Sequence, residues 1–224
     1  MFVILQAGKV AGRAGHEERT FLWEAASGKK IQTFQGHTTG VGNVALSGDG
    51  KHVVTGSYDK TAILWETASG KKLQTFQGHT GEVFSVAVSG DGKHVVTGSL
   101  DKTAILWEAA SGKKLQTFQS HTAGVFGVAL SGDGKHVVTG SWDNTAILWE
   151  AASGKKLQTF QGHTGYVYSV ALSGDGKHVL TGSDDNTAIL WEAANGAVPW
   201  DRFLRNAVVK ARSDGSRMKA TKEE

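Results

Sequence analysis

Cysteine is absent from the 224-residue chain, and proline occurs only once. Without cysteine the chain offers no disulfide framework, zinc–thiolate site, iron–sulfur cluster or cysteine nucleophile. A single proline excludes collagen-like sequences and proline-rich linkers. No apolar run approaches the ~18 residues of a membrane span, and the first residues lack the basic and long apolar segments of a signal peptide. We therefore expect a cytoplasmic protein without a membrane partner.

Net positive charge is small, and it is concentrated near the C-terminus. The chain has 24 basic and 21 acidic residues, and seven of the basic but only three of the acidic residues lie from Arg202 onward. The main body is therefore slightly acidic, so a nucleic-acid partner is not expected. Residues 205–224 are expected to form a basic, disordered tail, with weak electrostatic attraction to an acidic partner or nucleic acid as the alternative.

Glycine, in contrast, is abundant, and it belongs to an internal repeat. The chain has 30 glycines, roughly twice ordinary usage. Tryptophan recurs every 42 residues, at Trp23, Trp65, Trp107, Trp149 and Trp191. The segment 78–119 is nearly copied in the segments that begin at residues 36, 120 and 162. Such a period indicates one supersecondary unit repeated along the chain.

Each intact copy predicts four short strands separated by glycine-containing turns. In the copy 78–119 these are VFSVAV, HVVTGS, TAILWE and LQTFQ. Strands of this length, with turn signals every 8–12 residues, are typical of an all-β protein and leave no room for helices. The turn glycines account for most of the glycine excess, because they can adopt positive φ.

Both ends of the chain depart from the repeat. Residues 8–23 align without gaps on residues 50–65, which places Phe2–Leu5 where a first strand is expected. The fifth copy loses its pattern near VPWDRFLR, where Pro199 suits only an edge position. The sequence thus predicts about five units, namely a degenerate first one at 1–35, intact ones at 36–77, 78–119 and 120–161, and one at 162–204 with a degenerate last strand.

The period, a Gly-His pair near one end of each copy and a tryptophan followed by an acidic residue near the other resemble the WD-repeat β-propeller family. The resemblance covers nearly the whole chain and implies four-stranded antiparallel blades. Two departures occur: the dipeptide is Trp-Glu in the intact copies, and the copy 120–161 opens with Ser120-His121. Neither departure affects the expected fold, because Ser120 is small and the resemblance implies a solvent-facing acidic residue.

The resemblance also implies a buried hydrogen-bonded chain of His, Asp, Thr and Trp in each blade. A buried indole N–H needs an acceptor, a hydroxyl can accept and pass on a hydrogen bond, and a carboxylate can fix an imidazole. The matching positions are His37, Asp59, Thr55 and Trp65; His79, Asp101, Thr97 and Trp107; His121, Asp143, Thr139 and Trp149; and His163, Asp185, Thr181 and Trp191.

The same residue types suggest a catalytic triad, but they recur at four equivalent positions. A catalytic site does not need four copies in one chain, so we expect no catalytic residues, no cofactor and no metal. The second histidine of each copy is expected to be a surface turn residue that points outward and away from its counterparts. These histidines are His52, His94, His136 and His178.

The large differences between the copies cluster at three places: the loop before the first strand, the start of that strand, and the turn before the aspartate. These places share one end of an antiparallel blade, so they predict one variable face. That face is rich in aromatic residues, as protein interfaces are, and the resemblance implies that it is the usual partner-binding surface. The alternative is drift, with the aromatic rings merely packing between blades. The predicted face residues are Tyr58, Glu82, Phe84, Leu100, Phe126, Trp142, Tyr166, Tyr168 and Asp184.

The sequence therefore predicts a non-catalytic scaffold for protein–protein interaction. The alternative function is a propeller that binds small ligands such as sugars at one site per pair of blades, which would favour identical face residues in every copy. Related propellers usually have seven blades, whereas this chain provides about five. It could close as a five-bladed ring, pair with a second copy to complete a larger ring, or be a fragment, and we expect self-association.

Overall fold

The structure is a computed structural model that describes residues 3–7, 19–24 and 26–196. The expected basic tail, and the degenerate last strand that includes Pro199, lie outside these residues. Within the described residues the chain forms strands and turns, and no helix has the length and apolar character needed to cross a bilayer.

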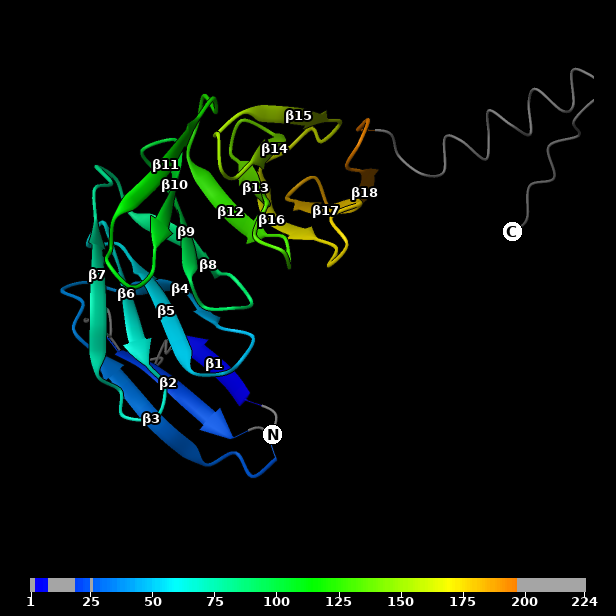
Figure 1. The fold of residues 1–224 in the computed structure, drawn as a ribbon. Coiled ribbons are helices and arrows are strands. Elements are labelled where there is room, and N and C mark those ends of the chain that lie inside the picture. Colours follow the sequence, from blue (N-terminus) through cyan, green and yellow to red (C-terminus); the bar gives the residue numbers. More distant parts are fainter. Residues whose placement is uncertain (1–2, 8–18, 25, 197–224) are drawn as a thin grey trace, which may run out of the picture.

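The strands form five antiparallel sheets, each built from consecutive strands (Figure 1). The three inner sheets, β4–β7, β8–β11 and β12–β15, have four strands, and the described parts of the two end sheets, β1–β3 and β16–β18, have three. The strands are β1 Val3–Ala7, β2 Arg19–Glu24, β3 Lys30–Gln35, β4 Val41–Leu46, β5 His52–Ser57, β6 Thr61–Glu66, β7 Lys72–Gln77, β8 Val83–Val88, β9 His94–Ser99, β10 Thr103–Glu108, β11 Lys114–Gln119, β12 Val125–Leu130, β13 His136–Ser141, β14 Thr145–Glu150, β15 Lys156–Gln161, β16 Val167–Leu172, β17 His178–Ser183 and β18 Ala188–Glu192.

Each inner sheet packs on a neighbour through both of its faces. We call the face toward the following sheet the forward face and the face toward the preceding sheet the rear face. On β10, for example, Leu106 packs forward against the following sheet, whereas Ile105 and Trp107 pack backward against the preceding one. The two middle strands of a sheet therefore read as nearly continuous buried runs, because both of their faces are covered.

Close contact between neighbouring sheets requires glycine at one recurring position. A Cβ atom added at Gly98 would lie 2.7 Å from Val128 Cγ1 and 2.9 Å from Val125 Cγ1. The same conflict recurs at Gly56 and Gly140. The second strand of each intact copy thus carries glycine because the first strand of the next sheet comes within contact distance of its backbone.

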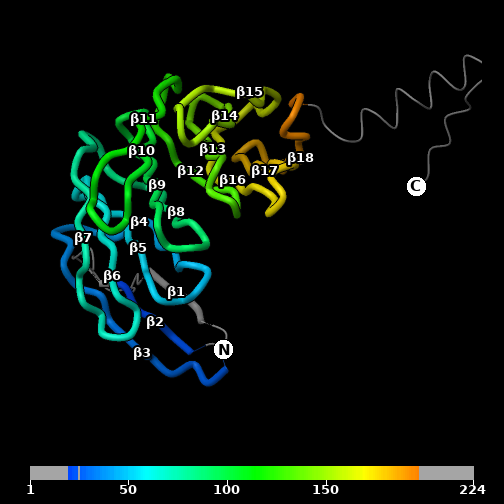
Figure 2. Tube along the Cα trace, viewed as in Figure 1, coloured from blue at the N-terminus to red at the C-terminus, as the bar shows by residue number. Residues whose placement is uncertain are grey.

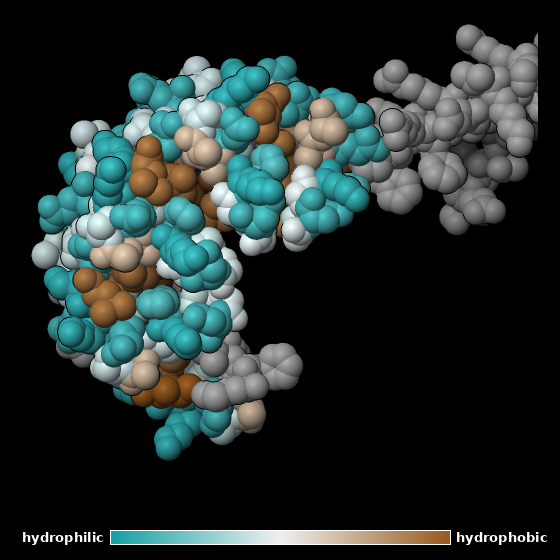
Figure 3. Space-filling model, viewed as in Figure 1, coloured by the Kyte–Doolittle hydropathy of each residue, from teal (hydrophilic) through white to brown (hydrophobic). Residues whose placement is uncertain are grey.

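The five sheets follow one another around an arc, and its two ends lie apart (Figures 1 and 2). The first strands of successive sheets lie side by side on the inner side of the arc, with β4 next to β8, β8 next to β12 and β12 next to β16. The space-filling view shows an open, C-shaped outline with apolar patches that recur along it (Figure 3). The described residues therefore form an open arc of blades and not a closed five-bladed ring.

The N-terminal sheet corrects one prediction. Ile4 lies opposite Trp23, in the register that Val53 has to Trp65. β1 therefore occupies the second-strand position, and the prediction that Phe2–Leu5 supplies a first strand was wrong. The sequence offers a physical reason, since the segment aligned with a second strand, VAGRAG, contains two glycines and an arginine, whereas VILQA is a better strand former.

Candidate interaction face and the buried histidine networks

Each of the last four sheets contains a buried chain of hydrogen bonds between a histidine and a tryptophan. In the sheet β8–β11, His79 Nδ1 lies 2.8 Å from Asp101 Oδ2, and His79 Nε2 lies 2.7 Å from Thr97 Oγ1. Trp107 Nε1 donates to the same Thr97 hydroxyl over 2.9 Å. The other three copies have these distances within 0.1 Å: His37, Asp59, Thr55 and Trp65; His121, Asp143, Thr139 and Trp149; and His163, Asp185, Thr181 and Trp191.

The partners determine the direction of the hydrogen bonds in a neutral histidine. A carboxylate only accepts, so the Nδ1–H of His79 donates to Asp101. Nε2 then accepts from the hydroxyl of Thr97, and that hydroxyl in turn accepts from Trp107 Nε1–H. Every polar atom from the indole to the carboxylate is therefore satisfied.

The aspartate also fixes the loop that carries the histidine. Asp101 Oδ2 accepts from the backbone N–H of Thr80, and Oδ1 accepts from the N–H and the hydroxyl of Thr103. The carboxylate thus joins the loop before the first strand to the turn after the second strand. The hydroxyl that a triad would need is Thr97 Oγ1, on a residue with no exposed surface. No substrate can reach it, so the arrangement serves structure rather than nucleophilic chemistry.

Burial and hydrogen bonding shift the pKa values within these networks. Burial of His37 away from water lowers its pKa below the ordinary value, and this effect outweighs the opposing influence of Asp59. Burial by itself would raise the pKa of Asp59, but hydrogen bonds from Thr61, Thr38 and His37 outweigh it and hold the pKa below its usual range. The pKa values of Asp101, Asp143 and Asp185 are lowered as well.

These shifts predict two stages of acid destabilisation. The unfolded chain takes up a proton at the His37 position more readily than the fold does, so the free energy of unfolding should fall as pH drops below the ordinary histidine pKa of 6.5. Below the ordinary aspartate value of 3.8, protonation of the four network aspartates favours the unfolded chain and should cause a steeper loss. Urea denaturation at pH 7.5, 5.5 and 3.5 measures both stages, and stability that rises on acidification would contradict the prediction.

The N-terminal sheet lacks this network. Trp23 Nε1 is buried and has no hydrogen-bond partner among the described residues. The strand register places Gln6 opposite Phe21, where Thr55 stands opposite Ile63 in the next sheet. The missing threonine leaves the indole without its usual acceptor. The degenerate sequence of the first copy has therefore lost the hydrogen-bond network.

Six aromatic rings form a row across the last four sheets, which we call the aromatic row. Phe126 stacks on Trp142 with ring centroids 4.0 Å apart and an interplanar angle of 11°. Trp142 in turn stacks on Tyr166 at 5.3 Å, and Phe126 contacts Phe84 at 4.3 Å. The row comprises Tyr58, Phe84, Phe126, Trp142, Tyr166 and Tyr168.

The backbone brings the two variable loops of each copy together. The N–H of Trp142 donates to the carbonyl of Gly124, and the N–H of Asp184 donates to the carbonyl of Tyr166. The equivalent bonds run from Tyr58 to Gly40 and from Leu100 to Glu82. The loop before the first strand and the turn before the aspartate therefore lie side by side in every intact copy.

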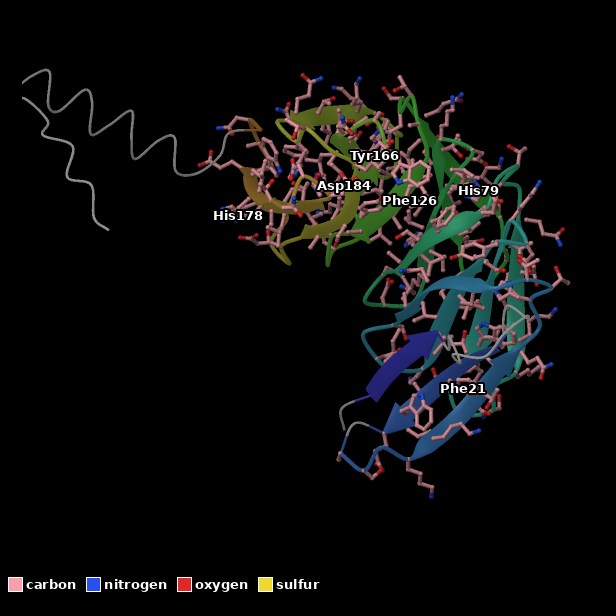
Figure 4. The ribbon with its side chains drawn as sticks, turned by 180° about the vertical axis from the view of Figure 1, so that it is seen from behind. Phe21, His79, Phe126, Tyr166, His178 and Asp184 are labelled. Atoms are coloured by element: carbon pink, nitrogen blue, oxygen red, sulfur yellow. The ribbon has the colours of Figure 1, made fainter. Side chains whose placement is uncertain are left out.

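The residues of the predicted interaction face differ in how much of their side chains is exposed to solvent. Tyr166 and Tyr168 are 43% and 45% exposed, whereas the other four rings of the row are half-buried. Asp184 is exposed beside Tyr166, and Figure 4 shows both near Phe126. The rings thus pack between blades, as the drift alternative expects, and they also leave an open aromatic surface at the C-terminal end of the arc.

The remaining two predicted face residues contribute little open surface. Leu100 is half-buried and packs over Gly124, where an added Cβ would lie 2.9 Å from Leu100 Cδ1. Glu82 is half-buried, and its backbone carbonyl takes part in the loop pairing.

A second set of concave sites lies at the other ends of the strands, and the sequence did not indicate it. Four equivalent grooves of about 550–670 Å³ lie between adjacent sheets. One of them is lined by His94, Leu106, Leu115, His136 and Glu150, among others. The signal that could have revealed them is the unvarying glycine turn, because identical turns in successive blades create identical junctions.

These grooves correct the prediction for the second histidines. His52, His94 and His136 are half-buried, and each lies between two successive grooves instead of pointing outward. His52 Nδ1 is buried without a partner, and an added Cβ at Gly92 of the next blade would lie 3.1 Å from it. The prediction failed because the following blade covers the turn. His178, in the last sheet, is exposed.

No group of three or more His, Cys, Asp or Glu side chains in the described part of the chain is arranged to hold a metal ion.

The repeated four-stranded sheets, the joining network and the shared junctions define a repeat protein of the propeller class. The family described as "WD domain, G-beta repeat" matches residues 28–66, 70–108, 112–150 and 154–192, more than half of the chain. The chain therefore belongs to the WD-repeat family, whose domains generally act as non-enzymatic scaffolds that bind other proteins. A search of curated proteins gave no match to this chain.

Proposed function

We propose that this protein is a non-catalytic scaffold that binds a partner protein through the aromatic row. The observation that carries the proposal is the continuous row of six contacting rings, three of them stacked, which ends in two tyrosines that are more than 40% exposed. Aromatic side chains are enriched at interfaces, and tyrosine combines a large apolar contact with a hydroxyl group. Stacking fixes these rings before the partner arrives, so less conformational entropy is lost on binding.

The charges near the exposed tyrosines indicate the chemistry of the partner. Asp184 is exposed and its backbone N–H donates to the carbonyl of Tyr166, whose ring stacks on Trp142. An arginine side chain can stack on a tyrosine ring while it pairs with a neighbouring carboxylate. We therefore favour a partner segment that presents basic and apolar side chains.

Removing the exposed rings should weaken partner binding strongly. The double variant Tyr166→Ala/Tyr168→Ala is expected to lower partner recovery at least tenfold, because truncating an interface hot spot costs roughly 2 kcal/mol or more. Affinity capture from cell extract, quantified by mass spectrometry against the wild-type protein, measures the loss.

Leu157→Ala provides the matched control, because Leu157 is 41% exposed but lies on the outer strand β15, away from the row. It should leave recovery unchanged. If every partner of the wild-type protein is recovered equally well with the tyrosine variant, the aromatic row is not the binding face.

The alternative of repeated small-ligand binding is supported only by the four equivalent grooves. Their lining residues are glycine, aliphatic, charged and histidine residues and one threonine, with no Phe, Tyr or Trp among them. A sugar ring would find no large aromatic face to stack against there. The support for a protein partner at the aromatic row is therefore stronger than the support for sugar binding in the grooves.

We also propose that copies of this chain self-associate. The support is the open arc, since sheets in the propeller class are normally covered on both faces.

A further inference from the structure

The C-terminal sheet leaves an apolar forward face uncovered. Leu180 and Leu190 are 45% and 37% exposed. Their counterparts in the preceding sheet, Val138 and Leu148, are 0% and 4% exposed, because β16–β18 cover them. The leucines of the last sheet are exposed because the described part of the chain supplies no further sheet.

The N-terminal sheet has the complementary deficit on its rear face. Phe21 and Trp23 are half-buried, whereas their counterparts Ile63 and Trp65 are each 2% exposed. The rear face of every later sheet is covered by the sheet before it. Phe21 lies at the far end of the arc from Tyr166 and Asp184 (Figure 4).

These two uncovered faces match the part of an internal junction that the second and third strands form; as described, β1–β3 lacks the first strand that completes the junctions inside the chain. Within the chain, Leu106 on a forward face packs in one core cluster with Ile147 and Trp149 on the following rear face. Leu190 occupies the position of Leu106, and Phe21 and Trp23 occupy the positions of Ile147 and Trp149. The ends of the arc thus present matching apolar side chains on strands of the same register.

We propose that a second copy of this chain docks the rear face of its N-terminal sheet on the forward face of the C-terminal sheet, head to tail. This inference rests on the self-association proposed above and specifies its surfaces; it does not depend on the aromatic row. The occupant is a second copy because the only uncovered rear face among the described sheets is that of β1–β3. Such a contact is heterologous, so it either closes into a ring or extends into a chain.

Paired surface variants test the two faces separately. Leu180→Asp/Leu190→Asp should disable the C-terminal face, and Phe21→Glu should disable the N-terminal face, where Lys30 Nζ, 5.2 Å from the Phe21 ring centroid, can pair with the new carboxylate. In sedimentation velocity across a concentration series, the wild-type protein should reach at least twice the mass of one chain. Each variant alone should remain a single chain.

An equimolar mixture of the two variants is the decisive sample. Each variant retains the face that the other has lost, so the mixture should form a complex of two chains and grow no further. Leu157→Asp, a charge added at an equally exposed leucine outside both faces, should assemble like the wild type. The variant Tyr166→Ala/Tyr168→Ala should also assemble normally, which separates this inference from the partner-binding face.

A crosslinking measurement covers the case in which Phe21→Glu does not fold. The chain contains no cysteine, so Phe21→Cys and Leu190→Cys each introduce a single thiol. Mild oxidation of their mixture should yield mainly the mixed disulfide between the two variants.

Three results would overturn the inference at different levels. A wild-type protein that stays a single chain at every concentration rejects self-association itself. Assembly that survives both face variants rejects these surfaces but leaves self-association standing. A predominant Leu190→Cys homodisulfide would mean that two C-terminal faces meet each other.

Discussion

Replacing Thr139 by valine should destabilise the protein by about 2–5 kcal/mol, because the change leaves two buried polar atoms without partners. Thr139 Oγ1 accepts from Trp149 Nε1 and lies 2.7 Å from His121 Nε2, and the residue has no exposed surface. Valine has nearly the same shape as threonine, so packing and strand propensity are retained. The loss therefore reports on hydrogen bonding alone.

Urea denaturation followed by tryptophan fluorescence measures this loss, and native-state hydrogen exchange locates it. Protection should fall first in β12–β15, because each blade contacts only its neighbours. Thr117→Val is the matched control, since Thr117 is exposed on β11 and takes no part in a network. A Thr139→Val protein as stable as this control would mean that the network contributes no net stability.

The second large effect is expected from a single methyl group at a sheet junction. Gly140→Ala places a Cβ atom 2.7 Å from Val170 Cγ1 and 2.9 Å from Val167 Cγ1, and Val167 is fully buried. Overpacking of this kind costs typically 1–3 kcal/mol. The substitution should lower the midpoint of urea denaturation accordingly.

Gly182→Ala is a control from the equivalent position of the last sheet. A Cβ atom there would meet only Ser169 Cβ, at 3.7 Å, because no following sheet of the described chain covers it. The change should be neutral or slightly stabilising, since alanine restricts the unfolded chain more than glycine does. Equal destabilisation by both substitutions would mean that the junction is not the cause.

Much of this fold could be predicted from the sequence because it depends on local signals. The 42-residue interval between tryptophans, the alternation in VFSVAV and the glycine turns determine four strands per intact copy, and the structure has them there. The four residues of each network were named from the resemblance to the WD-repeat family. Their chemistry agrees with it, because a buried indole, hydroxyl, imidazole and carboxylate can satisfy one another.

The first sheet could not be predicted correctly, because strand pairing is a competition between segments. The gap-free alignment favoured residues 10–15 as the second strand, yet β1 pairs with β2 in that position. The positions of the second histidines were missed for a related reason. Whether a turn is exposed depends on the neighbouring blade, and His52 lies under the turn of the next one.

By itself, the amino-acid sequence determined the repeat, the all-β class and the strands of the intact copies, because these follow from short-range patterns. Its resemblance to the WD-repeat family named the members of each buried network. Only the tertiary structure decided which surfaces those copies leave uncovered. The same repeated residues are buried in the middle of the arc and exposed at its ends: Val138 has no exposed surface, whereas Leu180 is 45% exposed. Burial of a sheet face depends on whether another sheet lies against it, and no local pattern of residues encodes that neighbour.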